Sequence, residues 1–189
     1  MQSQEKRAEE ERKKSLTRSK KALEETINAL ASAVETRDPY TAGHQERVAK
    51  LACAIAKKMD LSQHRIEGIR MASLIHDIGK INVPAEILSR PSKLTDTEIS
   101  LIREHPKIGY DILKKIDFPW PIAKIVLQHH ERMSGKGYPA GLSGKKILLE
   151  SRIIGLADVV EAMCSHRPYR PAKGIEQALK EIIKNKGSL

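Results

Sequence analysis

Apolar residues recur at helical spacing along almost the whole chain, and this pattern restricts the fold more than any other feature of the sequence. One run places Val48, Leu51, Ala52, Ile55 and Met59 on a single helix face. No stretch alternates apolar and polar residues with a period of two for long enough to make a sheet. Only 3 % of the residues are aromatic, so the core must be built from aliphatic side chains and Met. The sequence therefore predicts an all-α fold.

Capping and breaking residues give the expected bounds of the other helices. Ser62 is a suitable N-cap for a helix that runs to Gly79. Thr95 and Glu98 form a capping box at the start of another helix. A glycine-rich loop is expected at residues 134–144. Further helices, each bounded by Pro or Gly, are expected at 107–115, 120–130, 150–164 and 174–185.

Residues 1–36 form a separate, highly charged segment without Gly or Pro, which we expect to be a linker helix. Its apolar residues make a short heptad stripe of Leu16, Leu23, Ile27, Leu30 and Val34. Two interpretations remain open: the helix pairs with its copy as a short coiled coil in a homodimer, or it docks on its own domain. Asp38 precedes a proline and ends the segment, so residues 37–189 are expected to form the main domain.

Charge and composition limit the partners. No apolar run approaches the roughly 20 residues needed to cross a bilayer, so we expect a soluble, cytoplasmic chain with no membrane contact of its own, unless it derives from a larger membrane protein. Residues 1–35 hold eight Lys or Arg and seven Glu, which leaves +9 of the formal charge of +10 on the rest. This surplus suits a phosphate ester or nucleotide. A nucleic acid polymer is not expected, because no aromatic residues are interleaved with the basic ones to stack bases and no nucleic-acid-binding motif is recognisable.

Histidines next to carboxylates are the strongest sign of chemistry. A single histidine on an apolar helix face is usually a hydrogen-bonded structural residue, but burying several imidazoles is costly unless something ligates them. Asp158 adds a carboxylate to an apolar run, where its partner is a metal, an arginine or a helix N-terminus. Nitrogen and oxygen donors without cysteine favour iron, manganese or another divalent transition metal. The five histidines concerned are His44, His76, His105, His129 and His130.

The adjacent residues His76 and Asp77 carry a geometric constraint of their own. Neighbouring residues on a helix diverge by about 100°, so the two side chains cannot share one face. They can still serve one site if the Asp77 carboxylate bridges two metals and the imidazole binds one. Lys80 follows Asp77 by three positions, which puts its ammonium at the same end of the helix, where it would contact a metal-bound phosphate.

Taken in order, these motifs resemble the HD-GYP subgroup of the HD-domain metal-dependent phosphohydrolases. The resemblance implies an HD-domain helical bundle with an N-terminal linker helix. It also implies hydrolysis of cyclic di-GMP to pGpG, and in some members to GMP. The matching segments are DPYTAGHQERV (38–48), HDIGK (76–80), EHP (104–106), HHERMSGKGYP (129–139) and ADVVEAMCSHRPYRP (157–171).

The resemblance also implies roles for single residues. Asp77 would bridge two divalent ions, iron or manganese, and a hydroxide between them would attack phosphorus in line, with Lys80 stabilising the developing charge. Tyr138, Arg167 and Arg170 would contact the substrate. The implied metal ligands are His44, His76, Asp77, His105, His129, His130 and Asp158.

Three departures from the family pattern modify these expectations. Ser134 replaces the aspartate of the HHExxDGxGYP signature, and Tyr40 stands where some members have an extra glutamate ligand. Tyrosine is a poor ligand near neutral pH, so we expect two metals rather than three. The chain stops where relatives continue, so it is expected to be a fragment of a longer protein with an upstream sensor or receiver domain, as in two-component response regulators. The alternatives to a cyclic di-GMP phosphodiesterase are a non-catalytic cyclic di-GMP receptor and a hydrolase of another cyclic dinucleotide.

Overall fold

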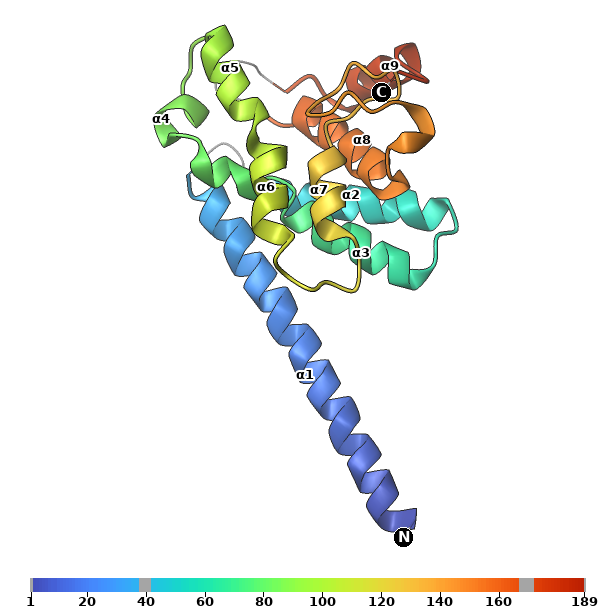
Figure 1. Ribbon diagram of the computed structural model, residues 1–189. Coiled ribbons are helices and arrows are strands. Elements are labelled where there is room, and N and C mark those ends of the chain that lie inside the picture. Colours follow the sequence, from blue (N-terminus) through green and yellow to red (C-terminus); the bar gives the residue numbers. More distant parts are fainter. Residues whose placement is uncertain (1, 38–41, 167–171, 189) are drawn as a thin grey trace.

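Helices make up the fold of the protein, for which the computed structural model describes residues 2–37, 42–166 and 172–188 (Figure 1). The described residues contain no β-strand, only an isolated bridge between Ser134 and Ser143, so the all-α prediction is confirmed. None of the described helices is long and apolar enough to cross a membrane. The elements are α1 (Gln2–Glu35), α2 (His44–Lys58), α3 (Gln63–Leu74), η2 (Ile78–Asn82), α4 (Ala85–Leu88), α5 (Asp96–Arg103), α6 (His105–Leu113), α7 (Ile122–Gln128), η3 (Gly144–Lys146), α8 (Leu149–Cys164) and α9 (Ile175–Lys184).

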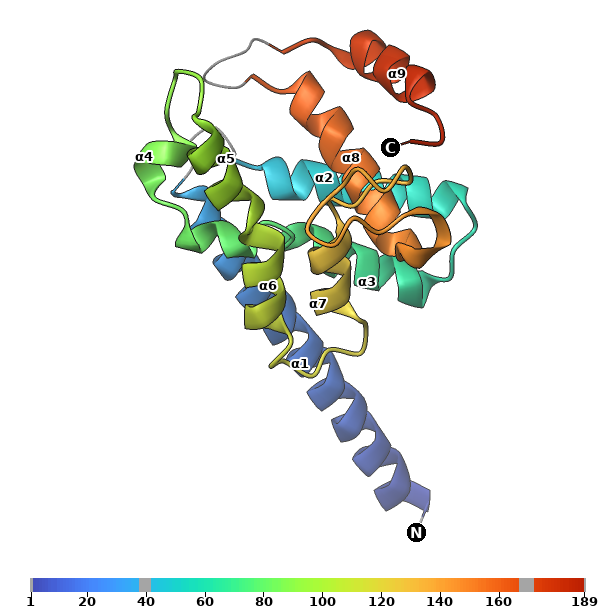
Figure 2. The same ribbon diagram turned by 45° about the horizontal axis from the view of Figure 1, so that its top comes forward.

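The long helix α1 projects from the body formed by the other helices, and only its C-terminal part packs against that body (Figures 1 and 2). Ile27 and Val34 are buried in the main core, whereas Leu16 is 61 % exposed. At the end of the helix, the Glu35 carboxylate accepts hydrogen bonds from the backbone N–H groups of Gly43 and Gln45, at 3.0 and 3.1 Å. Glu35 thereby caps the N-terminus of α2, whose unpaired N–H groups need an acceptor.

Helices α2, α3 and α8 form the centre of the body. Their contact faces are fully buried at Val48, Ala52, Ile69, Ile154 and Ala157. The small residues among these allow the helices to pack closely without aromatic side chains. Helix α6 packs against both α7 and η2, so the segments that carry the histidines meet on one side of this core.

One predicted helix is shorter than expected. The helix expected to reach Gly79 does start after its N-cap Ser62, but it ends at Leu74, so placing His76 and Asp77 on that helix was wrong. The cause is tertiary: a Cβ on Gly79 would lie 1.9 Å from the backbone oxygen of His105, so η2 approaches α6 as closely as glycine allows. The Thr95–Glu98 capping box is present, and the four helices predicted after it agree with the structure within two residues at each end.

Candidate metal centre

The structure brings all seven predicted ligands together from five segments of the chain. His44 opens α2, His76 and Asp77 lie in the turn between α3 and η2, and Asp158 lies on α8. The histidines form two groups, and within each group of three residues the potential ligand atoms all lie within 4.8 Å of one another. Asp158 belongs beside the first group, because its Oδ1 lies 3.3 Å from Nε2 of His44. The groups are His44, His76 and Asp77, and His105, His129 and His130.

Three of the buried histidines are held in the same way. Each follows the end of a helix, where the last backbone carbonyls lack an intrahelical partner, and its Nδ1 hydrogen-bonds the carbonyl three residues before it. A carbonyl only accepts, so Nδ1 carries the proton and the Nε2 lone pair remains for a ligand. The pairs are His76 with Ser73 at 2.8 Å, His105 with Ile102 at 2.7 Å, and His129 with Val126 at 2.5 Å.

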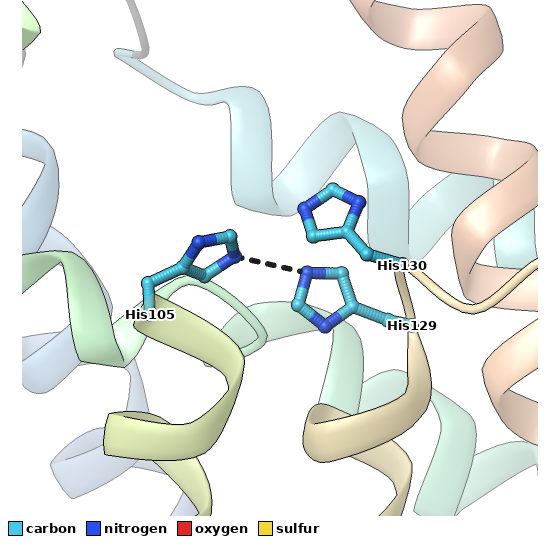
Figure 3. Close-up of side chains that lie close together, drawn as sticks. All are labelled: His105, His129 and His130. Atoms are coloured by element: carbon cyan, nitrogen blue, oxygen red, sulfur yellow. Dashed lines mark hydrogen bonds between the residues drawn. The ribbon is translucent and has the colours of Figure 1, made fainter. Parts of the chain in front are cut away.

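Figure 3 shows the second group, in which His105 and His129 point their Nε2 atoms at each other across 3.3 Å, beside His130. Burial lowers the pKa of His105 to about 4 and that of His130 to about 3. Burial, with the neighbouring imidazoles, also holds the pKa of His129 well below its ordinary value. All three imidazoles are therefore neutral near pH 7, which is the state that binds a metal.

The Asp77 carboxylate lies between the two groups and offers one oxygen to each. Its Oδ1 is 3.3 Å from Nε2 of His105, whereas its Oδ2 is 3.5 Å from Nε2 of His76 and 3.9 Å from Nε2 of His44. A carboxylate that faces two clusters of lone pairs in this way has the arrangement of a bridging ligand.

Two side chains hold Asp77 in this position. Lys80 donates to its Oδ2 at 2.7 Å and Gln45 donates to the same oxygen at 3.3 Å. Burial alone would raise the pKa of Asp77, but Lys80 and the surrounding imidazoles hold it well below its ordinary value. The carboxylate is therefore ionised, and Lys80 lies beside it on η2 rather than on the helix that the sequence predicted. Gln45 was not predicted, since its role depends on the contact between α2 and the turn that carries Asp77.

His44 differs from the other buried histidines because its Nδ1 contacts a side chain, the carboxylate of Glu161. Burial alone would lower the pKa of His44, but the carboxylates of Asp158 and Glu161 raise it to about 9. The environment of this imidazole thus favours a positive charge, which a metal would supply in place of a proton. Sequence reasoning missed Glu161, although it follows Asp158 by three positions and so lies on the same face of α8.

The half-buried residues show from which side a substrate can approach. Two of the predicted ligands, Asp158 and His130, are half-buried, whereas the other five are fully buried; Lys80 is half-buried as well. The Tyr138 ring stacks on His130 with the ring centres 4.7 Å apart, and the Arg103 guanidinium lies 5.4 Å from the Tyr138 ring centre. Tyr138 therefore lies on the same, less buried side of the site as His130. Of the other predicted residues, Arg167, Arg170 and Tyr40 lie outside the described residues.

The loop that carries Tyr138 is organised by Glu131, another residue that sequence reasoning missed. The buried Glu131 carboxylate accepts hydrogen bonds from the backbone N–H groups of Ala140 and Leu142, at 2.7 and 2.8 Å. Ser134, the departure from the family signature, donates its hydroxyl to the backbone oxygen of Ser188 at 3.1 Å. An ionised aspartate could not donate this bond, so the substitution changes what the loop contacts.

The chemistry of this donor set fits divalent transition-metal ions. Imidazole nitrogens and carboxylate oxygens converge on a buried region, and among the described residues no cysteine belongs to either group. Such ligands suit iron, manganese and similar ions better than a structural thiolate zinc site.

Comparison with known proteins agrees with this geometry, since the model of the HD domain family matches residues 28–189. The chain belongs to the HD domain family. A structural neighbour, the HDGYP protein Bd1817 of Bdellovibrio bacteriovorus, covers 77 % of this HD-domain chain at 22 % identity, with a TM-score of 0.64. Together with the motifs at 76–80 and 129–139, these matches confirm the expected HD-GYP subgroup.

Several curated relatives align with most of this HD-domain chain. The cyclic di-GMP phosphodiesterase response regulator RpfG of Xanthomonas campestris pv. campestris is 41 % identical over 87 % of the chain and 44 % of its own length. A cyclic di-GMP phosphodiesterase of Thermotoga maritima is 40 % identical over 88 % of the chain and 46 % of its own length. The 3'3'-cGAMP-specific phosphodiesterase 3 of Vibrio cholerae is 39 % identical over 86 % of the chain and 35 % of its own length. The chain thus spans less than half the length of these relatives.

A second solved structure supports the fold. The HD domain of the Listeria monocytogenes phosphodiesterase PgpH is 27 % identical, covers 83 % of both chains and has a TM-score of 0.58. The predicted HD-domain helical fold is therefore confirmed.

Proposed function

We propose that this HD domain is a metal-dependent phosphodiesterase that hydrolyses cyclic di-GMP to pGpG. The observation that carries the proposal is the Asp77 carboxylate, which offers one oxygen to each of two histidine groups at 3.3 and 3.5 Å. Relatives named as cyclic di-GMP phosphodiesterases at 40 and 41 % identity support this choice of substrate.

The two groups would hold two divalent ions, iron or manganese, in this proposal. Asp158 would complete the group around His44, and Asp77 would join the two. When bound, the ions would supply positive charge for the phosphoryl oxygens and activate water as the nucleophile. No third ion is proposed, because position 40 holds tyrosine rather than a carboxylate.

The other residues of the site would bind and orient the substrate. The Lys80 ammonium lies beside the buried Asp77 carboxylate and is itself half-buried. There it would contact a phosphoryl oxygen of the substrate. Tyr138 stacks on His130 at the less buried side of the site, and its ring would pack against the substrate. Arg167 and Arg170 would add guanidinium groups, whose paired donors match phosphate oxygens.

Hydrolysis of another cyclic dinucleotide is a second candidate. The specific observation in its favour is the Vibrio cholerae relative, which is 39 % identical and is named for 3'3'-cGAMP. The same metal ligands would serve either substrate, because both present cyclic 3'–5' phosphodiesters.

The test is incubation of Mn²⁺-loaded or Fe²⁺-loaded protein with cyclic di-GMP and, in parallel, with 3'3'-cGAMP, followed by chromatography of the products. We expect linear pGpG from cyclic di-GMP, and no product after the metal has been removed by a chelator. Faster turnover of 3'3'-cGAMP would favour the second candidate. Tight binding of cyclic di-GMP without any product would contradict both and indicate a receptor.

The neighbouring domains and the oligomeric state of this HD domain are also matters of proposal. We propose that α1 connects the domain to an upstream sensor or receiver domain and pairs with its copy in a homodimer. The exposed Leu16 on the projecting part of α1 supports pairing, and the greater length of the relatives, one of which is named a response regulator, supports the further domain. A cytoplasmic location would follow, since cyclic di-GMP is a cytoplasmic signal.

A further inference from the structure

The histidine that opens α2 needs a different support from the others. His76, His105 and His129 follow helix ends and use a free backbone carbonyl. His44 is the first residue of α2, where the unpaired backbone groups are N–H donors, and its Nδ1 therefore needs an acceptor from elsewhere. That acceptor is the carboxylate of Glu161, which reaches across from α8.

We infer that Glu161 is a positioning residue that orients His44 and strengthens metal binding at the His44 group selectively. The inference rests on the proposed metal centre. The carboxylate of Glu161 accepts a hydrogen bond from Nδ1–H of His44, so the Nε2 lone pair of His44 faces Asp158 and Asp77, at 3.3 and 3.9 Å. A carboxylate partner also makes the imidazole a stronger donor to a metal than a backbone carbonyl does.

Glu161 is itself held in place by two further hydrogen bonds. Arg47 donates from Nε to Glu161 Oε1 at 2.7 Å, and Ser165 donates its hydroxyl to the same oxygen at 2.6 Å. The other oxygen, Oε2, contacts His44. Because Arg47 lies one turn after His44 on α2, Glu161 joins two positions of α2 to α8, and only 6 % of its surface is exposed. Its orientation is therefore restricted from both helices.

This arrangement predicts that the two metal positions are unequal. In the second group, His105 and His129 have backbone carbonyls as partners of Nδ1. Loss of Glu161 therefore leaves the second group intact and weakens the first. A purely structural role, in contrast, would lower stability and affect both positions alike.

The test is a calorimetric titration of chelator-treated protein with Mn²⁺ alone. It is carried out on the wild type, Glu161→Ala and Glu161→Gln. We expect Glu161→Ala to weaken one of two sites 10- to 100-fold and to leave the other unchanged. Glu161→Gln keeps an oxygen acceptor but not the charge, so its loss should be smaller. Circular dichroism and thermal melting of each variant show whether it folds.

A matched control lies on the same helix. The Glu150 carboxylate also joins α8 to a neighbouring helix, through two hydrogen bonds from Arg65 at 2.9 and 2.7 Å, but it is not part of the metal centre. Glu150→Gln should lower the melting temperature and leave both Mn²⁺ affinities as in the wild type. Equal Mn²⁺ binding in Glu161→Ala and wild type, or equal weakening of both sites, would overturn the inference.

Failure of this inference is distinct from failure of the proposed function. The titration measures Mn²⁺ binding and needs no substrate. Wild-type protein that binds two ions but does not hydrolyse a cyclic dinucleotide would refute the proposed reaction and leave the role of Glu161 standing. Unchanged turnover in Glu161→Ala, together with unchanged Mn²⁺ binding, would refute the role of Glu161 and leave the proposed reaction standing.

Discussion

Replacing Lys80 by alanine separates a catalytic role from a structural one. The Lys80 ammonium lies 2.7 Å from Asp77 Oδ2, and its side chain is 19 % exposed. Near a protein surface, two unit charges about 4 Å apart interact by about 4 kcal/mol. A phosphoryl oxygen gains only part of a charge in the transition state, so we expect a loss of roughly 1.4 to 4 kcal/mol, or about 10- to 1000-fold in turnover.

Two measurements on Lys80→Ala distinguish a catalytic from a structural role of Lys80: the rate of cyclic di-GMP hydrolysis and the metal content per chain. We expect the rate to fall and the metals to stay, because His44, His76 and the second histidine group remain in place. The control is Lys114→Ala, which removes a lysine from another i, i+3 pair with aspartate, solvent-exposed at the C-terminal end of α6 and not paired with any of the predicted metal ligands. Loss of metal from Lys80→Ala would refute the catalytic role, and so would an unchanged rate.

Other substitutions test other parts of the site. His76→Ala and Asp77→Ala should each abolish metal binding and turnover, while circular dichroism shows unchanged helicity. Full metal content and activity in Asp77→Ala would contradict the role of Asp77 as a bridging ligand. Gly79→Ala should lower the free energy of unfolding in urea by about 3 kcal/mol, because its Cβ would meet the neighbouring backbone at 1.9 Å. Glu35→Ala should lower it by about 1 kcal/mol through loss of the cap on α2, and an unchanged urea midpoint would show that the cap contributes nothing.

Local patterns in the sequence predicted most of the helices. The N-cap Ser62 and the capping box at Thr95 act through residues three positions away, so a reader of the sequence sees both partners. The end of α3 could not be predicted in this way. It depends on how closely η2 approaches α6, and Gly79 alone gives no indication of which element will lie against it.

The metal ligands could be proposed from the sequence because their spacing forms recognisable motifs. The residues that position them were harder to find. Glu161, Gln45 and Glu131 act on partners that only folding brings near, and the partner of Glu161 lies 117 residues away in the chain. The backbone anchors of His76 and His129 are local, three residues back, but they exist only because α3 and α7 end just before these histidines.

An anomalous-scattering map of crystals grown from Mn²⁺-loaded protein is the most direct test of the metal centre. We expect two peaks, one on each side of the Asp77 carboxylate, the first contacted by His44 and His76 and the second by His105 and His129. Elemental analysis of the same protein should give two metal ions per chain. Three fully occupied positions, a single peak, or peaks away from Asp77 would contradict a two-metal centre bridged by this residue.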